Sequence, residues 1–428
     1  MSAEVRFIPV TMRLPLKFGG ETVSTITVAH AEVCAYGATG QGETPLSVGW
    51  AWPSAHSFAY RETMMCDFTR LLADEFTASD DDPMSGGYRF SETVLPRLLE
   101  KFNRDNDTDM PLLAALICWS AFDIAAHDAF GLALGLPTYR TYNAKYMKHD
   151  LAHYFGEERF AGLYPEDFFV KEVPETLPVW HLVGGKDLLL ERERTGSEPD
   201  DGYPVSLEKW IERDGLKCLK IKLTGRDPEW DLDRMVSVGE IALRYGCEAL
   251  SPDFNCMVET PDYVNGVLDR LRERHPDIFG LIAYVEQPFP YDLEKHRIDV
   301  HSCSARRDLF MDESAHDWKL VKLGRELGWT GVALKVCKSQ TGALLSACWA
   351  KAHGMKLMVQ DLTNPMLAQI PHVLLAAHVG TIKGVECNAP QFYPEASLEY
   401  EKKHPGLYER RNGVVVIKSL NGNGLAMR

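Results

Sequence analysis

The chain has 428 residues, of which 45% are hydrophobic and 25% are charged, and its formal net charge at pH 7 is -15. This is the composition of a globular protein with ample core, and the length leaves room for a second domain beside a barrel of about 250 residues. The acidic balance argues against nucleic acid or an anionic membrane surface as the main partner, since both require clustered Lys and Arg.

Two further features of the sequence indicate the cellular localisation of the protein. No apolar stretch reaches the roughly 20 residues of a membrane span, and residues 1–9 carry early charges without the apolar segment of a signal peptide. The ten cysteines include no CxxC pair and lie mostly inside hydrophobic runs, which predicts reduced core residues. We therefore expect a cytoplasmic protein with no membrane partner.

The first third of the chain predicts an α+β domain. Residues 5–45 alternate in strand fashion and break at glycines, a pattern typical of an antiparallel meander. From about residue 55 the pattern becomes helical, and it is clearest over residues 110–134. We assign residues 1–150 to this N-terminal domain and expect the C-terminal tail, residues 395–428, to return to it.

Residues 137–176 form a long connection that is rich in aromatic residues and lacks clear periodicity. Connections of this length usually line a functional site or meet another subunit. The sequence leaves both readings open, and we expect a homo-oligomer.

The following region, residues 170–394, predicts a parallel barrel. Short apolar runs alternate with helical stretches along it, and the runs lie at residues 177–182, 219–223, 249–255, 281–287, 309–313, 332–336, 356–361 and 382–388. Strands that alternate with helices at this period form βαβ units, and a long series of such units closes into a barrel.

Strand parity points a set of polar side chains into this barrel. Successive side chains of a strand face opposite ways, so Lys220 and Lys222 point inward while the aliphatic residues beside them pack on helices. The same alternation turns further polar residues inward on later strands: Asp253 with Asn255, Glu286, Asp312, Lys335 and Gln360. At the C-terminal ends of barrel strands, inward polar residues form the active site.

Three of these residues are carboxylates on consecutive strands: Asp253, Glu286 and Asp312. An all-oxygen set of this kind suits a divalent cation that keeps some waters, most simply Mg2+. The alternative is three separate ion pairs with Lys220, Lys222 and Lys335, but such pairs need not recur at one strand position. Glu313 is expected to support the ligands through a hydrogen bond rather than to bind the ion.

A cation beside two lysine-bearing strands suits the removal of a proton next to a carboxylate, with Lys220 helping to spread the charge of the intermediate. A free lysine has a pKa of about 10.4, but burial beside a second ammonium and a dication lowers it, so Lys222 is a candidate base. Lys335, across the barrel, is a second, and Lys338 is disfavoured because parity places it in the following loop. Two amines that flank a substrate predict racemisation or epimerisation.

Five motifs in order resemble those of the enolase superfamily, and most closely its muconate-lactonizing subgroup. Lys220-Ile221-Lys222 resembles the family's KxK, Asp253-Phe254-Asn255 its DxN, residues 285–288 its EQP, residues 311–314 its DES, and residues 334–338 its sixth-strand lysine segment. Residues 121–128 are similar to the helix before the family's barrel, and residues 17–20, with Phe18, to its substrate-capping loop.

The resemblance implies an α/β fold, a modified TIM barrel of the (β/α)7β type with an α+β capping domain. It also implies Mg2+ on the three carboxylates, Lys222 and Lys335 as the two bases, and a small-molecule carboxylate substrate. The expected substrate-binding residues are Asn255, Gln360, Glu386, Asn388 and Phe18.

The chain departs from the family on its last two barrel strands. The amino acid and dipeptide epimerases usually carry DxD on the eighth strand, where Glu386-Cys387-Asn388 keeps one charge and loses the other. Gln360-Asp361 replaces the usual small or acidic pair on the seventh strand, and no histidine stands where the mandelate racemase branch needs one.

The same residues are compatible with other outcomes. A dehydratase or synthase would follow if the intermediate eliminates a leaving group, and a cycloisomerase if it closes or opens a ring. A metal-free aldolase that forms a Schiff base on lysine and a barrel without catalysis are disfavoured by the aligned carboxylates and by the retention of both lysines.

Overall fold

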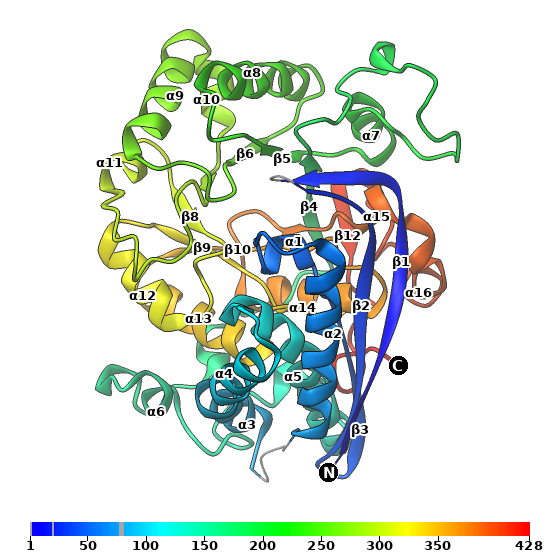
Figure 1. Cartoon of the computed structure of the whole chain (residues 1–428), viewed down its shortest axis with the longest axis vertical. Coiled ribbons are helices and arrows are strands. Elements are labelled where there is room, and N and C mark those ends of the chain that lie inside the picture. The colour runs from blue at the N-terminus through cyan, green and yellow to red at the C-terminus, as the bar shows by residue number, and fades with distance from the viewer. Residues whose placement is uncertain (1, 19–20, 77–80) are drawn as a thin grey trace.

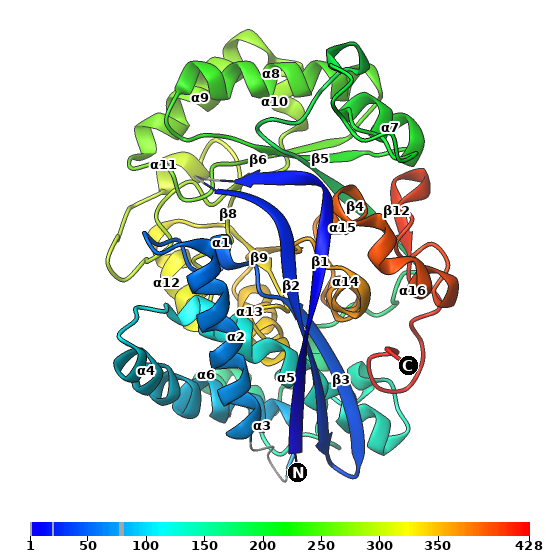
Figure 2. The ribbon, with the colours of Figure 1, turned by 45° about the vertical axis from the view of Figure 1, so that its right-hand side comes forward.

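The N-terminal domain begins with three antiparallel strands, β1 (Ser2–Phe18), β2 (Glu21–Ala35) and β3 (Ala38–Pro45), in the order β1-β2-β3. The computed structural model describes residues 2–18, 21–76 and 81–428, without the side chains of residues 17, 18 and 21. The predicted meander is confirmed. Both views show the far end of β1 reaching across toward the barrel strands (Figures 1 and 2).

Two helices, α2 (Phe58–Asp74) and α5 (Leu112–Leu134), pack on this sheet. The other helical elements of the domain pack around them: α1 (Val48–Ala51), α3 (Pro83–Arg89), the π-helical turn η1 (Phe90–Val94) and α4 (Leu95–Asn106). Helix α5 lies so close to β3 that a Cβ at Gly40 or Gly42 would stand 2.1 Å from a backbone oxygen of α5. Contrary to expectation, α5 is long and apolar enough to cross a membrane by length and composition, but 94% of its apolar window is buried inside the fold.

The second unit is a curled sheet of parallel strands. Its members are β4 (Thr176–Val183), β5 (Cys218–Lys222), β6 (Ala249–Asp253), β7 (Val285–Glu286), β8 (Leu309–Met311), β9 (Gly331–Leu334), β10 (Lys356–Val359) and β11 (Val385–Glu386). The ladders run in the order β10-β9-β8-β7-β6-β5-β4-β11. Within the described residues β10 and β11 share no ladder, and the Ile382 N–H bonds to the Leu357 carbonyl at 2.9 Å across this joint.

Helices connect these strands on the outside of the barrel: α7 (Leu207–Asp214), α8 (Pro228–Arg244), α9 (Pro261–Arg274), α10 (Pro276–Leu281), α11 (His301–Ser304), α12 (Trp318–Leu327), α13 (Gln340–Ala352) and α14 (Gln369–Val379), with 3-10 turns η5 (Glu191–Glu193) and η6 (Met366–Ala368). The order of elements gives the (β/α)7β-type arrangement that the sequence predicted.

The barrel interior has the alternation expected from strand parity. Its apolar floor is one cluster of Trp180, Cys218, Ala249, Tyr284, Phe310 and Met358, in which the Tyr284 and Phe310 rings stack at 4.3 Å. Two residues further along the same strands stand the inward polar positions, such as Lys220 after Cys218 and Glu286 after Tyr284. The layer of polar side chains therefore packs directly on this hydrophobic layer, which sets the position of the polar side chains along the barrel axis.

The long connection, residues 137–176, holds η2 (Thr138–Arg140), α6 (Leu151–Phe155), η3 (Glu158–Phe160) and η4 (Pro165–Phe168). It packs on the barrel helices: Tyr139 stacks on His378 of α14 at 3.8 Å, and Phe155 meets Trp318 of α12 at 5.1 Å. Its aromatic residues thus serve the core between the two units, a role that neither sequence reading anticipated.

The tail holds α15 (Ala389–Phe392), η7 (Pro394–Ser397), α16 (Leu398–Lys403), η8 (Arg411–Gly413) and β12 (Val414–Val416). Strand β12 pairs antiparallel with β4, so the strand of the tail joins the barrel and not the N-terminal sheet. The tail also reaches the N-terminal domain: Ala396 and Tyr400 pack against a hydrophobic cluster that includes residues of β1 and β2, and the Leu425 N–H donates to Asp128 of α5 at 2.7 Å. The β4 edge takes this strand because β11 pairs with only its central residues.

Candidate functional site

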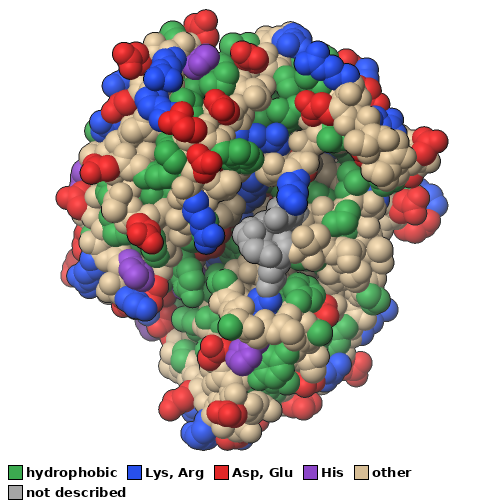
Figure 3. Space-filling model, turned by 45° about the horizontal axis from the view of Figure 1, so that its top comes forward, with side chains coloured by type: hydrophobic (Ala, Val, Ile, Leu, Met, Phe, Trp, Pro, Cys, Tyr) green, Lys and Arg blue, Asp and Glu red, His purple; other side chains and the backbone are tan. Residues whose placement is uncertain are grey.

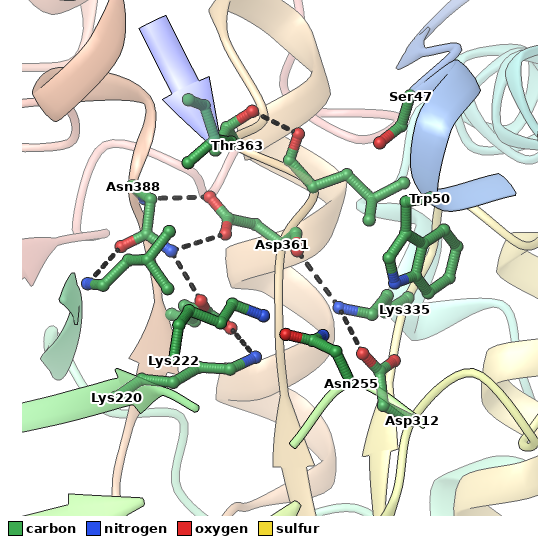
Figure 4. A pocket seen from close by; sticks show the side chains of 14 residues that line it. Ser47, Trp50, Lys220, Lys222, Asn255, Asp312, Lys335, Asp361, Thr363 and Asn388 are labelled. Carbon is green, nitrogen blue, oxygen red and sulfur yellow. Dashed lines mark hydrogen bonds and ion pairs between the residues drawn. The ribbon is translucent and has the colours of Figure 1, made fainter. Parts of the chain in front are cut away.

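A pocket lies at the C-terminal ends of the barrel strands, beneath the N-terminal domain, and its empty volume is about 570 Å³, part of which is open to solvent. Its lining combines Leu16, Ser47 and Trp50 of the N-terminal domain with Leu182, Lys220, Lys222, Asn255, Asp312, Lys335, Asp361, Leu362, Thr363, Glu386 and Asn388 of the barrel (Figure 4). The molecular face shown in Figure 3 is hollowed near its centre, where basic side chains are visible, and acidic and basic side chains are interspersed around it.

The three predicted lysines all reach this pocket. Lys220 donates to Glu286 Oε1 at 2.5 Å and lies 3.2 Å from Asp253 Oδ2, while Lys222 donates to Asp253 Oδ2 at 2.5 Å. Lys335 lies 3.3 Å from Asp312 Oδ2. Figure 4 shows Lys222 and Lys335 extending into the pocket from different sides, as the two-base prediction requires.

Lys338 is not among the residues that line the pocket. Its ammonium donates to the Asp312 carbonyl at 2.5 Å and to the Ala315 carbonyl at 3.0 Å, and its side chain is buried. These two bonds anchor the loop after β8, so the geometry favours Lys335 over Lys338 as the reacting amine.

Two of the pocket lysines have raised pKa values. Burial lowers the pKa of Lys220 and Lys335, but neighbouring carboxylates outweigh it, chiefly Glu286 for Lys220 and Asp312 for Lys335. Both pKa values therefore lie above that of a free lysine.

The three predicted metal ligands lie together in the barrel mouth. Asp253 and Glu286 are in register on neighbouring strands, and all three carboxylates are buried. Burial, then the charge of Asp253, holds the pKa of Glu286 well above its usual range. Burial and the charges of Asp312 and Asp253 likewise raise the pKa of Glu313 to about 7.

In this structure Lys220, Lys222 and Lys335 form ion pairs with the three carboxylates, as the alternative to a metal site predicts. Among the described residues, no three His, Cys, Asp or Glu side chains are grouped closely enough to hold an ion. The chemistry of the donor set nevertheless fits Mg2+: the ligands are hard oxygens, they are buried and repel one another, and Asp312 Oδ1 is buried without a hydrogen-bond partner.

The predicted substrate-binding residues separate into three groups. Asn255, Glu386 and Asn388 line the pocket. Gln360 does not; it is fully buried beneath Lys220, where its amide donates to Tyr284 Oη at 2.9 Å and to Glu286, and so it supports a carboxylate. The side chain of Phe18, with Gly19 and Gly20, lies outside the described residues.

Glu313 bonds to two residues of the pocket lining and not to the three predicted metal ligands. Its Oε1 accepts hydrogen bonds from Trp50 Nε1 at 2.9 Å and from Asn255 Nδ2 at 3.4 Å. The first of these bonds links the N-terminal domain to the carboxylate cluster.

Asp361 is a pocket residue that sequence reasoning missed. Its carboxylate accepts from the Asn388 N–H at 2.8 Å and from Asn388 Nδ2 at 3.1 Å. Parity along the seventh strand turned Gln360 inward and Asp361 outward, but β10 ends at Val359, and beyond a strand end the alternation no longer holds. A second polar residue directly after a strand end was the available signal.

Comparison with known proteins found a matching family and a related enzyme. Residues 204–428, more than half of the chain, match the family described as enolase C-terminal domain-like. An aromatic dipeptide epimerase of Herpetosiphon aurantiacus is 24% identical over 255 residues, which span 58% of this chain and 66% of that relative.

Solved structures match over nearly the whole chain. A mandelate racemase/muconate lactonizing protein from Herpetosiphon aurantiacus superposes with a TM-score of 0.65 at 18% identity, over 99% of this chain and 96% of the other. A dipeptide epimerase from Enterococcus faecalis, complexed with Mg and the dipeptide L-Leu-L-Tyr, gives 0.64 at 17% identity, over 99% and 98%. At these identities the likeness shows the fold alone.

Proposed function

Because this chain belongs to the mandelate racemase/muconate lactonizing enzyme family of the enolase superfamily, we propose that it removes the α-proton of a carboxylate substrate and returns a proton to the opposite face. One observation carries this proposal: Lys222 at the end of β5 and Lys335 after β9 line the same pocket from different sides. Two amines placed in this way can serve as base and acid on the two faces of one carbon.

The other pocket residues support the same reaction. Asp253, Glu286 and Asp312 would hold Mg2+, which supplies positive charge to offset the carboxylates and to attract the carboxylate of the substrate. The Lys220 ammonium, which is buried among carboxylates, can donate a hydrogen bond to a substrate oxygen on which negative charge develops. The apolar side chains of Leu16, Leu182 and Leu362 line the pocket, where they would keep water from the reacting carbon.

The pocket also favours a substrate with a positively charged group. Asp312 and Glu386 each have a lysine within 3.4 Å, but Asp361 forms no ion pair with any described residue. Asn388 Nδ2 donates to both Asp361 and Glu386, so the two acids share one corner of the pocket. Asp361 thus supplies a second carboxylate beside position 388, where the sequence lacks one, and a substrate amino group fits there, as in a dipeptide.

Replacement of Asp361 by Asn is expected to lower kcat/KM for substrates with a free amino group by about 10- to 100-fold, because a hydrogen bond to a charged group contributes about 1.5–3 kcal/mol. The same substrates with an acetylated amino group should be turned over by both proteins within a few-fold. Steady-state kinetics on matched pairs of dipeptides measures this. Equal losses on both members of a pair would show that Asp361 only holds the loop.

The proposed function is tested by proton NMR of the Mg2+-loaded protein in D2O with dipeptides, N-acyl amino acids, aldonic acids and aromatic 2-hydroxy acids. We expect loss of an α-proton signal without new products. New alkene or keto signals would instead support the β-elimination or cycloisomerase alternatives, for which the same lysines would serve. Absence of both changes, with Mg2+ shown to bind, would contradict the proposal for these substrate classes.

A further inference from the structure

The N-terminal domain places one aromatic side chain, Trp50, at the wall of the pocket. After β3 the chain turns at Ser47, which has a left-handed φ of 45°, into the short helix α1. Val48 and Ala51 of this helix are buried in the hydrophobic core of the N-terminal domain. Trp50 lies between them in sequence, remains half-buried, and lines the pocket (Figure 4).

Two contacts hold the indole of Trp50 in place. Its Nε1–H donates to Glu313 Oε1 at 2.9 Å. Its ring also lies 5.6 Å from the Lys338 ammonium, which two backbone carbonyls anchor. Both partners belong to the barrel, so the ring is fixed relative to the carboxylate cluster and not only to its own domain.

The third contact of the ring is with Lys335, whose ammonium lies 5.3 Å from the ring centroid. This is within the range of about 6 Å in which a cation is attracted to an aromatic face. Among the side chains that the structure describes, no aromatic ring lies over Lys222, whose close partner is Asp253. The indole therefore touches one of the two amines.

We propose that Trp50 is a positioning residue for Lys335 and acts on only one of the two faces of the substrate carbon. The inference rests on the proposed function, because it needs two amines that serve opposite faces. With the ring in place, the Lys335 side chain is confined by the indole, by Asp312 and by the Asp361 carbonyl, to which its amine donates at 3.1 Å. Without the ring, the amine gains room to move, while Lys222 keeps its surroundings.

The test is α-proton exchange in D2O, started separately from each enantiomer of a substrate that the wild-type protein exchanges. A Lys335→Ala variant identifies the enantiomer whose proton faces Lys335. Trp50→Ala is then expected to slow exchange of that enantiomer by about 3- to 30-fold, the range for loss of a cation–π contact, and to leave the other within about twofold. Trp50→Phe, which keeps a ring but loses the bond to Glu313, should restore most of the rate.

Trp52→Phe is the matched control. Trp52 lies two residues further on, and its Nε1 donates to a carboxylate at 3.2 Å, but it is buried in the core of the N-terminal domain. We expect this control to change both enantiomers alike. Equal slowing of both enantiomers by Trp50→Ala would overturn the positioning role, as would unchanged exchange of both. If the alanine variant does not fold, Trp50→Leu, which removes the ring but keeps a bulky apolar side chain, takes its place with the same expected result.

Failure of the proposed function gives a different pattern. If Lys335→Ala exchanges both enantiomers at the wild-type rate, the two-base mechanism is wrong, and the inference for Trp50 is wrong with it. If Lys335→Ala is selective for one enantiomer and Trp50→Ala is not, only the inference for Trp50 fails.

Discussion

Replacement of Lys335 by Ala is expected to abolish racemisation while the enantiomer whose proton faces Lys222 still exchanges that proton with solvent. Lys222→Ala should give the opposite selectivity. Removal of a general acid or base costs about 10²- to 10⁴-fold in rate, and each amine serves one face of the carbon. Exchange from each enantiomer, followed by NMR, together with optical rotation for racemisation, measures both effects.

Lys338 provides the control for this prediction, because it lies three residues from Lys335 but bonds to the Asp312 and Ala315 carbonyls. Replacement of Lys338 by Met should impair both enantiomers to the same degree, since it loosens the loop after β8 without removing a reacting amine. Racemisation that persists in both the Lys222 and the Lys335 variant would contradict the two-base assignment.

Chelation of divalent ions is expected to reduce turnover by at least about 10³-fold, and Mg2+ should restore it, because the ion supplies charge stabilisation worth several kcal/mol. Replacement of Asp253 by Asn should raise the Mg2+ concentration needed for activity or remove activity altogether. A binding readout is available besides turnover: Mg2+ should raise the thermal unfolding midpoint of the wild-type protein, since it binds the folded state alone, and do so less for the Asp253 variant.

Glu313→Gln is the matched control for the metal site. Glu313 neighbours Asp312 and is buried, but it accepts hydrogen bonds from Trp50 and Asn255, so its amide variant should keep the response of the unfolding midpoint to Mg2+. Full turnover after treatment with EDTA would exclude the metal site. If borohydride then trapped a substrate on Lys222 or Lys335, the Schiff-base alternative would take its place.

Much of the barrel and its polar layer could be predicted from the sequence because both follow from local rules. Strands alternate their side chains with a period of two, so Lys220 and Lys222 had to share a face, and their neighbour Ile221 had to pack outward. Polar residues that end successive strands of a parallel barrel then meet at one end of it. Asp253, Glu286 and Asp312 were predicted to lie together without any knowledge of a contact.

Local rules fail where a strand ends or where distant segments meet. Asp361 follows β10 in a loop, and its direction is fixed by Asn388 of a different strand end. Trp50 reaches the pocket only because α1 is packed into the N-terminal domain and that domain is docked on the barrel. Trp50 has no signature in its own sequence neighbourhood, and the only local signal for Asp361 is its place directly after a strand end.

The sequence by itself determined the order of the strands, the inward set of lysines and carboxylates, and the donor chemistry suited to Mg2+, because these depend on periodicity and residue type. Only the tertiary structure decided that β12 joins β4, that residues 137–176 pack between the two units, and that neighbouring carboxylates raise the pKa values of Lys220 and Lys335. The physical reason is that these features are set by the burial and electrostatics of side chains far apart in the chain, which no local pattern records.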